Sequence, residues 1–249
     1  MSEAVRYGGL DFTRTEIRWR AYHRIVPSRY PPVALFEDLG DPADWETIAA
    51  IESLTNPRLS ESIGALDRVP PEHRVNGPGA SYLMAPFVHA SPDRPGRFHD
   101  GTHGALYVAK TFRTALREVA QHHAHFLQAT DEPPGWTGAF RGLQGRLRAR
   151  LVDARFVPEL RTEDWTRSQR IGLEARRAGE AGVVYASLRD PGGEAAALFR
   201  PNVADAPVQI DHLRYHWDGI RIDIVRRAPA QPSHGVGAGL GEVLRLADL

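Results

Sequence analysis

The clearest pattern along the chain is an alternating run that passes directly into a run with helical spacing. In residues 104–109 (GALYVA), Leu106 and Val108 point to one face and Tyr107 to the other, which is typical of a strand. Apolar residues then recur every three or four positions up to the break at residues 131–134, after a threonine that can cap a helix. This predicted strand and helix form the most distinct unit in the sequence.

Alternating or short apolar runs predict several further strands. They lie at residues 22–26, 146–151, 183–187, 195–199, 208–213 and 220–225. The dipeptide Asp218-Gly219 is a typical hairpin turn, so we expect the last two strands to pair. In the run 146–151 arginines alternate with apolar residues, which predicts a half-buried strand with a basic outer face. We interpret that face as solvated or as a partner-facing strand edge, with a nucleotide site as the weaker alternative.

Helical spacing predicts two more helices. One begins after Asp41, which can act as its cap, and ends at Asn56-Pro57. The other opens with a Thr166/Gln169 capping box and runs toward Gly179. Two apolar pieces are less distinct: residues 81–88 are compatible with a strand and residues 240–249 with a terminal helix.

The order of these elements bounds the fold. Strands do not alternate regularly with helices, which favours an α+β fold over a doubly wound parallel sheet. A chain of 249 residues can form one large domain. We expect a single domain over residues 1–249, with a core at 18–227, an inserted helical and loop excursion at about 40–95, and a tail at 228–249.

Composition narrows the classes of function. The chain carries 31 basic and 31 acidic residues, which argues against direct binding of nucleic acid or an anionic membrane as its main activity. No apolar run spans a bilayer and the start lacks a secretory pattern, so we expect a cytoplasmic protein. Cysteine is absent, which excludes disulfides and thiolate chemistry.

Four polar side chains stand out around the distinct unit. Arg97 lies in a glycine-bounded loop ten residues before Tyr107, and Glu118 follows Tyr107 by eleven residues on the predicted helix. Ser187 ends a separate apolar strand. Taken alone, each has an ordinary interpretation: Arg97 as a loop charge, Tyr107 as a core residue, Glu118 as a helix residue paired with Arg117 or His122, and Ser187 as a turn residue.

Together these residues resemble the RES-domain family. The run GRFHDGTHGALYVAKTFRTALREV is similar to its Gly-Arg-aromatic turn, apolar-Tyr strand and Ala-Leu-x-Glu helix, and GVVYASLRDPGGEAAALFRP to its serine strand. Arg24, in YHRIV, resembles the family's opening arginine. One departure is Phe98-His99, where the family often has Trp-Asn. The match covers about 130 residues plus Arg24, and four spaced points are more specific than any single motif.

The resemblance implies a fold similar to ADP-ribosyltransferases, with a split, mixed or antiparallel β core flanked by helices, and an activity on NAD. It also implies a toxin of a type II toxin–antitoxin system, held inactive by an Xre-like helix-turn-helix antitoxin. The implied site residues are Arg97, Tyr107, Glu118 and Ser187, with Arg24 as a substrate-binding residue.

The chemistry of the side chains points the same way. Breaking the nicotinamide–ribose bond passes through an oxocarbenium-like state, which a carboxylate such as Glu118 stabilises. Arginines 24 and 97 suit the pyrophosphate, and Tyr107 offers the nicotinamide an aromatic face and a hydroxyl. Ser187 can orient Glu118 or bind the ribose or carboxamide. No metal is needed, because nicotinamide leaves as a neutral pyridine.

We therefore predict an enzyme that binds NAD as substrate and passes ADP-ribose to water or phosphate. A protein acceptor, which would make it an ADP-ribosyltransferase, is the first alternative. The second is a metal-dependent hydrolase or oxygenase built from two histidine-rich pieces: His99, Asp100 and His103, and His122, His123 and His125. A non-catalytic interaction protein is a third class. The sequence leaves the acceptor, any target protein and the oligomeric state open.

Overall fold

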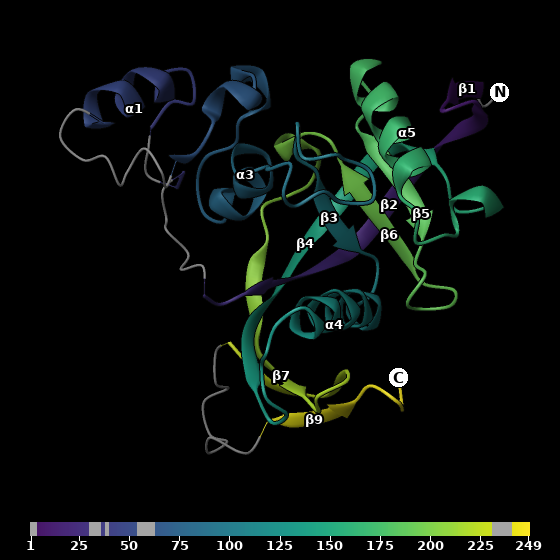
Figure 1. Ribbon diagram of the computed structural model, residues 1–249. Helices are drawn as coiled ribbons and strands as arrows, with labels where there is room; N and C mark the ends of the chain where they lie inside the picture. The colour runs from purple at the N-terminus through teal and green to yellow at the C-terminus, as the bar shows by residue number, and fades with distance from the viewer. Residues whose placement is uncertain (1–3, 30–35, 38–39, 54–62, 231–240) are drawn as a thin grey trace.

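The computed structural model describes residues 4–29, 36–37, 40–53, 63–230 and 241–249 (Figure 1). Within them, nine strands join one sheet in the order β1-β2-β3-β6-β5-β4-β7-β8-β9. The strands are β1 (Ala4–Tyr7), β2 (Leu10–Pro27), β3 (Leu106–Ala109), β4 (Thr137–Asp153), β5 (Gly182–Ala186), β6 (Glu194–Leu198), β7 (Val208–Trp217), β8 (Ile222–Pro229) and β9 (Glu242–Arg245). Only the β4–β5 pairing is parallel. The fold is therefore α+β with a mostly antiparallel sheet, as the sequence predicts.

Two long strands organise the sheet. β2 and β4 pair from Thr13↔Asp153 to Pro27↔Phe140, with a bulge on β2 between Trp19 and Tyr22. β2 also meets β3, and β4 also meets β5. Because β6 joins β3 to β5, the strands β2, β3, β6, β5 and β4 close a ring of pairings. Strands β7, β8 and β9 extend the sheet from the other end of β4, toward the bottom of Figure 1.

Helices cover the ring on both faces. The α-helices are α1 (Trp45–Ser53), α3 (Ala80–Val88), α4 (Phe112–Gln128) and α5 (Thr166–Arg177). Val184 belongs to the apolar cluster that contains α3, and its neighbour Val183 to the cluster that contains α5. α4 packs instead with β7 and β8. Burial on both faces explains why β5 and β6 are continuously apolar rather than alternating.

The distinct strand and helix of the sequence are present as β3 and α4. The Thr111 side chain accepts a hydrogen bond from Thr114 N–H and so caps α4, as predicted. The basic run is part of β4, where Arg146, Arg148 and Arg150 are exposed and the apolar residues between them are buried or half-buried. The β7–β8 hairpin is also confirmed, with longer strands than predicted.

Three local predictions are wrong. Residues 81–88 form helix α3 rather than a strand, and the end of the chain forms strand β9 on the edge of β8 rather than a helix. Thr166 is the first residue of α5, not its cap: the side chain of Trp165 at the N-cap makes no capping bond, and the Asp164 carboxylate accepts a 2.9 Å hydrogen bond from Thr166 N–H. The strand expected at residues 22–26 is present, as the end of the longer strand β2. The predicted helix end at Asn56-Pro57 lies outside the described residues.

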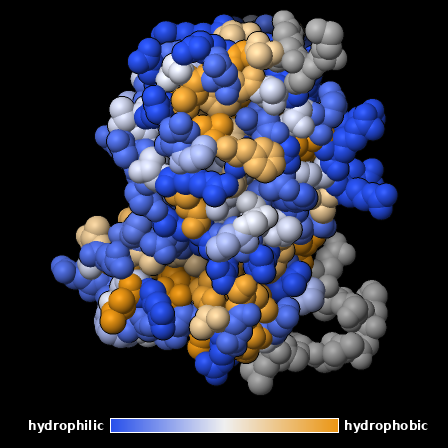
Figure 2. Space-filling model, turned by 90° about the vertical axis from the view of Figure 1, so that its right-hand side faces the viewer, coloured by the Kyte–Doolittle hydropathy of each residue, from blue (hydrophilic) through white to orange (hydrophobic). Residues whose placement is uncertain are grey.

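The surface is mostly polar. Figure 2 shows one largely hydrophilic face, with hydrophobic patches in both its upper and its lower half. Exposed large apolar side chains include Ile220 after β7 and Val243 in β9. In the described part of the chain, no helix is long and apolar enough to cross a membrane.

Candidate active site

One cavity lies where β2, β3 and the first turns of α4 meet β5 and β6. Its volume of about 310 Å³ is at the lower end of the range of small-molecule pockets. Four of the five candidate residues line it, namely Arg24, Arg97, Tyr107 and Glu118. The polar and aromatic part of the remaining wall consists of His23, His122, Glu163, Trp165, Tyr185 and Arg189. Residues far apart in sequence are thus brought together around one cavity.

The loop that carries Arg97 is held tightly against β3. Phe98 N–H donates a hydrogen bond of 2.8 Å to the Tyr107 hydroxyl, and Gly96 N–H donates one of 2.9 Å to the His99 carbonyl. A Cβ on Gly96 would lie 2.7 Å from the Tyr107 hydroxyl, so a larger residue would push loop and strand apart. The ten-residue spacing between Arg97 and Tyr107 therefore corresponds to direct contact between their segments.

The Arg97 guanidinium is buried at the cavity wall. Its Nη2 donates to the carbonyls of Leu160 (2.6 Å) and Thr162 (3.3 Å), and its Cζ lies 5.3 Å from the Tyr185 ring centroid. Its Nε is buried and has no hydrogen-bond partner among the described residues. Because an unsatisfied buried donor is costly, this cation keeps capacity to bind an anion.

Arg24 supplies a second cation from β2. Its Nη1 donates a 2.7 Å hydrogen bond to the Tyr82 carbonyl in α3, which fixes the side chain across the ring of strands. Burial lowers the pKa of the guanidinium to about 10, so it stays cationic at neutral pH. Two fixed guanidinium groups in one cavity favour a ligand with negative charge.

Tyr107 is positioned as a donor. Its hydroxyl oxygen accepts the Phe98 hydrogen bond, while its own proton has no acceptor in the described part of the chain. Burial raises the pKa of this phenol, which therefore remains protonated. The hydroxyl can consequently donate to a bound ligand.

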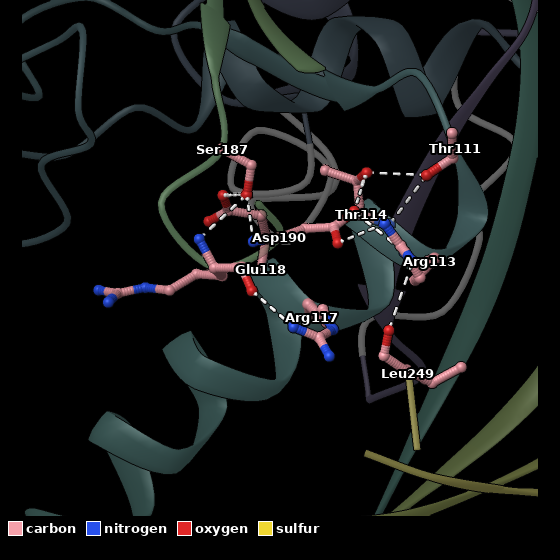
Figure 3. Close-up of polar contacts among 9 residues, drawn as sticks. Thr111, Arg113, Thr114, Arg117, Glu118, Ser187, Asp190 and Leu249 are labelled. Atoms are coloured by element: carbon pink, nitrogen blue, oxygen red, sulfur yellow. Dashed lines mark hydrogen bonds and ion pairs between the residues drawn. The ribbon is translucent and has the colours of Figure 1, made fainter. Parts of the chain in front are cut away.

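Glu118 and Ser187 are directly bonded. Ser187 Oγ donates a hydrogen bond of 2.5 Å to Glu118 Oε1, and it accepts bonds from Arg189 N–H (3.1 Å) and Asp190 N–H (3.0 Å) (Figure 3). Glu118 Oε2 has no partner among the described residues. Arg117 instead donates to the Arg189 carbonyl. The interpretation of Glu118 as a helix residue paired with Arg117 is therefore wrong.

Asp190 is a site residue that the sequence reasoning missed. Its carboxylate is buried, accepts a 2.7 Å bond from Thr114 Oγ1 and pairs with Arg113 Nη2 at 2.9 Å. These contacts tie the loop bearing Ser187 to the first turn of the helix bearing Glu118 (Figure 3). A Cβ on Gly193 would lie 2.7 Å from the same carboxylate. The sequence signal for Asp190 is its place at the start of Asp-Pro-Gly-Gly, a pattern typical of a turn.

Tyr185 and Trp165 were also missed. Period-two alternation places Tyr185 on the same face of its strand as Ser187, which is the signal that could have found it. Trp165 and Glu163 lie on the loop before α5. Glu163 forms an ion pair of 2.5 Å with Arg189, which lies on the loop after β5, and both side chains line the cavity. The Glu163–Arg189 pair thus joins the two loops that border the cavity.

The histidines fall into different environments. His122 lines the cavity, whereas His123, the next residue, packs against Trp136 and Phe140 with ring centroids 5.4 and 5.0 Å away. The His99 ring lies 5.8 Å from that of Tyr107. Within the described residues, no three His, Asp or Glu side chains come together in a way that could hold a metal ion.

Comparison with known proteins places these residues in a family. The RES domain model matches residues 71–218. A relative from Sinorhizobium fredii (strain NBRC 101917 / NGR234), the uncharacterized protein y4oC, is 33% identical over 206 residues, which are 82% of this chain and 86% of the relative. A crystal structure of the M. tuberculosis MbcT-MbcA toxin-antitoxin complex aligns with a TM-score of 0.39 and 12% identity, over 78% of this chain and 86% of that one. By the RES match and the 33% identical relative, the chain belongs to the RES domain family.

Proposed function

We propose that this protein binds NAD and cleaves its nicotinamide–ribose bond. The observation that carries the proposal is that Arg24, Arg97, Tyr107 and Glu118 line one cavity, with Ser187 bonded to Glu118. Membership of the RES domain family supports it, since the resemblance implies activity on NAD. The ring of strands with a helix on each face is compatible with the ADP-ribosyltransferase-like fold that we propose on the same basis.

Each side chain has a role in that reaction. The two guanidinium groups bind the pyrophosphate, and the hydroxyl of Tyr107 donates to the substrate. Glu118 Oε2 faces the ribose C1′ and stabilises the positive charge that develops there, while Ser187 fixes the other carboxylate oxygen. As the C1′–N bond breaks, its electron pair stays on the pyridine nitrogen, so nicotinamide leaves neutral. When the acceptor is water, its oxygen bonds to C1′ and its proton goes to Glu118 and then to solvent. Phosphate bonds to C1′ through an anionic oxygen, and no proton is transferred.

The acceptor is water or phosphate in this proposal. The two guanidinium groups would attract phosphate as well as substrate, so phosphorolysis is compatible with the charge of the cavity. A protein acceptor is the alternative, and the segment around residues 40–95 would then be its docking region. The three acceptors share one oxocarbenium-like state and differ in the product.

We also propose that the protein is the toxin of a type II toxin–antitoxin system. In that role NAD loss would stop growth of the producing cell until an Xre-like antitoxin binds. Family membership supports this assignment, and residues 1–249 would act as one RES-type domain. Co-expression with an Xre-like antitoxin should then restore growth and yield a stable complex.

The test is product analysis with NAD labelled in its adenylate half, with and without phosphate and with cell extract. ADP-ribose, phosphorylated ADP-ribose or a labelled protein band selects the acceptor. We expect Glu118→Gln to lose nicotinamide release while remaining folded, and Glu159→Gln, an exposed glutamate, to retain it. No nicotinamide release under any condition would refute the proposal, and loss of activity with a chelator would favour the metal-dependent alternative.

A further inference from the structure

Two hollows adjoin at the end of β5 and β6 that is remote from the cavity. The first, of about 500 Å³, and the second, of about 220 Å³, share Gly179, Glu180 and Arg200. They reach Ala181 before β5 and Phe199 after β6, whereas the cavity reaches Tyr185 and Ala195 at the opposite end. Four residues of strand separate the two ends, or about 13 Å. No residue is shared with the cavity, so this is a separate site.

The hollows are strongly basic. Arginines come from β2, β4, α5 and the segments before α3 and after β6, and they are Arg14, Arg68, Arg148, Arg150, Arg176 and Arg200. Glu180 is the one acidic residue in the lining of either hollow. In a protein with zero formal net charge, such a concentration of one sign is a local feature of this surface.

Glu180 already forms an ion pair with Arg14. Its Oε1 accepts a 2.7 Å bond from Arg14 Nη2 and a 2.7 Å bond from the Tyr7 hydroxyl. Burial alone raises the pKa of Glu180. Hydrogen bonds from Arg14 and Tyr7 and the charges of Arg14 and Arg150 outweigh this effect, so the pKa is lowered and the carboxylate is ionised at neutral pH. Glu180 therefore compensates Arg14 and leaves the other arginines of the first hollow without a carboxylate in its lining.

Arg148 and Arg200 are two arginines of the first hollow whose surroundings favour a bound anion. Arg148 lies directly opposite Arg18 in the β2–β4 ladder, and like charges in such a pair destabilise a sheet. Arg150 lies opposite Glu16 and is partly balanced. Arg200 has a buried Nε with no hydrogen-bond partner among the described residues, as expected for a donor whose acceptor is a ligand.

We propose that these hollows bind a small molecule carrying two or more phosphate groups. Guanidinium groups bind phosphate through two parallel hydrogen bonds, which suits a cluster of arginines better than a single charge. The concave shape favours a small molecule over a duplex. The lining of the first hollow contains no aromatic side chain on which a base could stack, so recognition is through the phosphates.

The experiment is calorimetric titration of the full chain with pyrophosphate. Because Arg24 and Arg97 can also hold pyrophosphate in the cavity, the titration is made with Arg97→Ala, which weakens that site, and we expect binding in the hollows to remain. Adding Arg148→Ala and Arg200→Ala to Arg97→Ala should weaken the remaining binding at least about tenfold, or by about 1.4 kcal/mol. Arg214→Ala removes an exposed strand arginine elsewhere and is the matched control. Adenosine diphosphate should bind like pyrophosphate if the arginines of the first hollow recognise the phosphates alone.

Several outcomes would overturn the proposal. They are no pyrophosphate binding by Arg97→Ala, equal loss whether Arg148→Ala with Arg200→Ala or Arg214→Ala alone is added to it, or oligonucleotide binding that depends on Arg148 and Arg200 without pyrophosphate binding. If the triple variant does not fold, Arg148→Ala added alone to Arg97→Ala decides, because the Arg148 side chain is exposed. The readout is independent of NAD cleavage, so failure of the proposed function leaves it unaffected.

Discussion

Ser187 Oγ and Glu118 Oε1 lie 2.5 Å apart and join a loop after β5 to the second turn of α4. The serine donates to the carboxylate while two backbone N–H groups donate to the serine. The hydroxyl rotor is therefore fixed, and Glu118 is held in one orientation at the cavity wall. In the sequence Ser187 is identified mainly by resemblance, whereas in the structure it has a defined role, which is to orient the Glu118 carboxylate.

Ser187→Ala should slow nicotinamide release without unfolding the protein. A hydrogen bond to a charged group contributes about 1.5–3 kcal/mol, which corresponds to a loss of about ten- to a hundredfold if it is needed in the transition state. Steady-state kinetics should show the loss in kcat more than in KM. Ser168→Ala is the control, because Ser168 Oγ is buried with no partner among the described residues. Equal rates in the two variants would remove Ser187 from the mechanism.

Asp190 should act as a positioning residue. Asp190→Ala removes the bond to Thr114 and the pair with Arg113, and we expect a loss of about 2–3 kcal/mol in unfolding free energy and a lower kcat. Asp190→Asn keeps one acceptor for Thr114 Oγ1 and should restore part of the activity. Denaturant melts and kcat measured on both variants test this. If Asp190→Ala lost stability but kept full kcat, the residue would be structural only.

The strand and helix around the site could be predicted from sequence because their signals are local. Tyr107 alternates with its neighbours, Glu118 has helical spacing, and Thr111 caps the helix, so three residues fix the geometry of the unit. The contact of Gly96 with Tyr107 is likewise a short-range consequence of the loop.

The remaining parts depend on contacts that spacing does not show. Residues 81–88 form an apolar run of eight, for which periodicity does not separate helix from strand. Residues 242–245 are a strand because the edge of β8 pairs with them. Asp190 meets Thr114 across 76 positions, so only the folded chain shows the pair. The basic hollows combine arginines from five segments and had no sequence motif.

Acid should destabilise the protein through its buried histidines. Burial lowers the pKa of His103 and of His123 to about 4, with nearby arginine charges adding to the effect. Both are neutral in the folded protein and titrate near 6.5 when unfolded. The two histidines contribute fully to the free energy of unfolding above pH 6.5, and this contribution is lost as the pH falls toward 4. Each histidine lowers the free energy of unfolding by up to about 1.4 kcal/mol per pH unit in that range. Urea titrations at a series of pH values measure this slope.

A variant assigns part of that slope to one residue. His123→Phe fits an aromatic environment and removes a ring nitrogen that is buried without a partner. The slope between pH 6.5 and 4 should become shallower in this variant. His212→Phe, at an exposed position of β7, should leave it unchanged. An unchanged slope in His123→Phe would show that this histidine does not contribute to acid unfolding.

Gly172→Ala tests whether α5 supports the Arg97 loop. A Cβ at this position would lie 2.0 Å from the Phe98 carbonyl oxygen, so helix and loop must separate. Glycine to alanine in an unobstructed helix stabilises a protein by about 1 kcal/mol, whereas overpacking costs about 1–3 kcal/mol. The sign of the change in melting temperature therefore distinguishes the two cases, and we expect the melting temperature to fall. Because Phe98 follows Arg97 and donates to Tyr107, nicotinamide release should fall as well.

Ser168→Ala, one turn earlier on the same helix, should change neither quantity, and a more stable, fully active Gly172→Ala would show that α5 does not hold the loop.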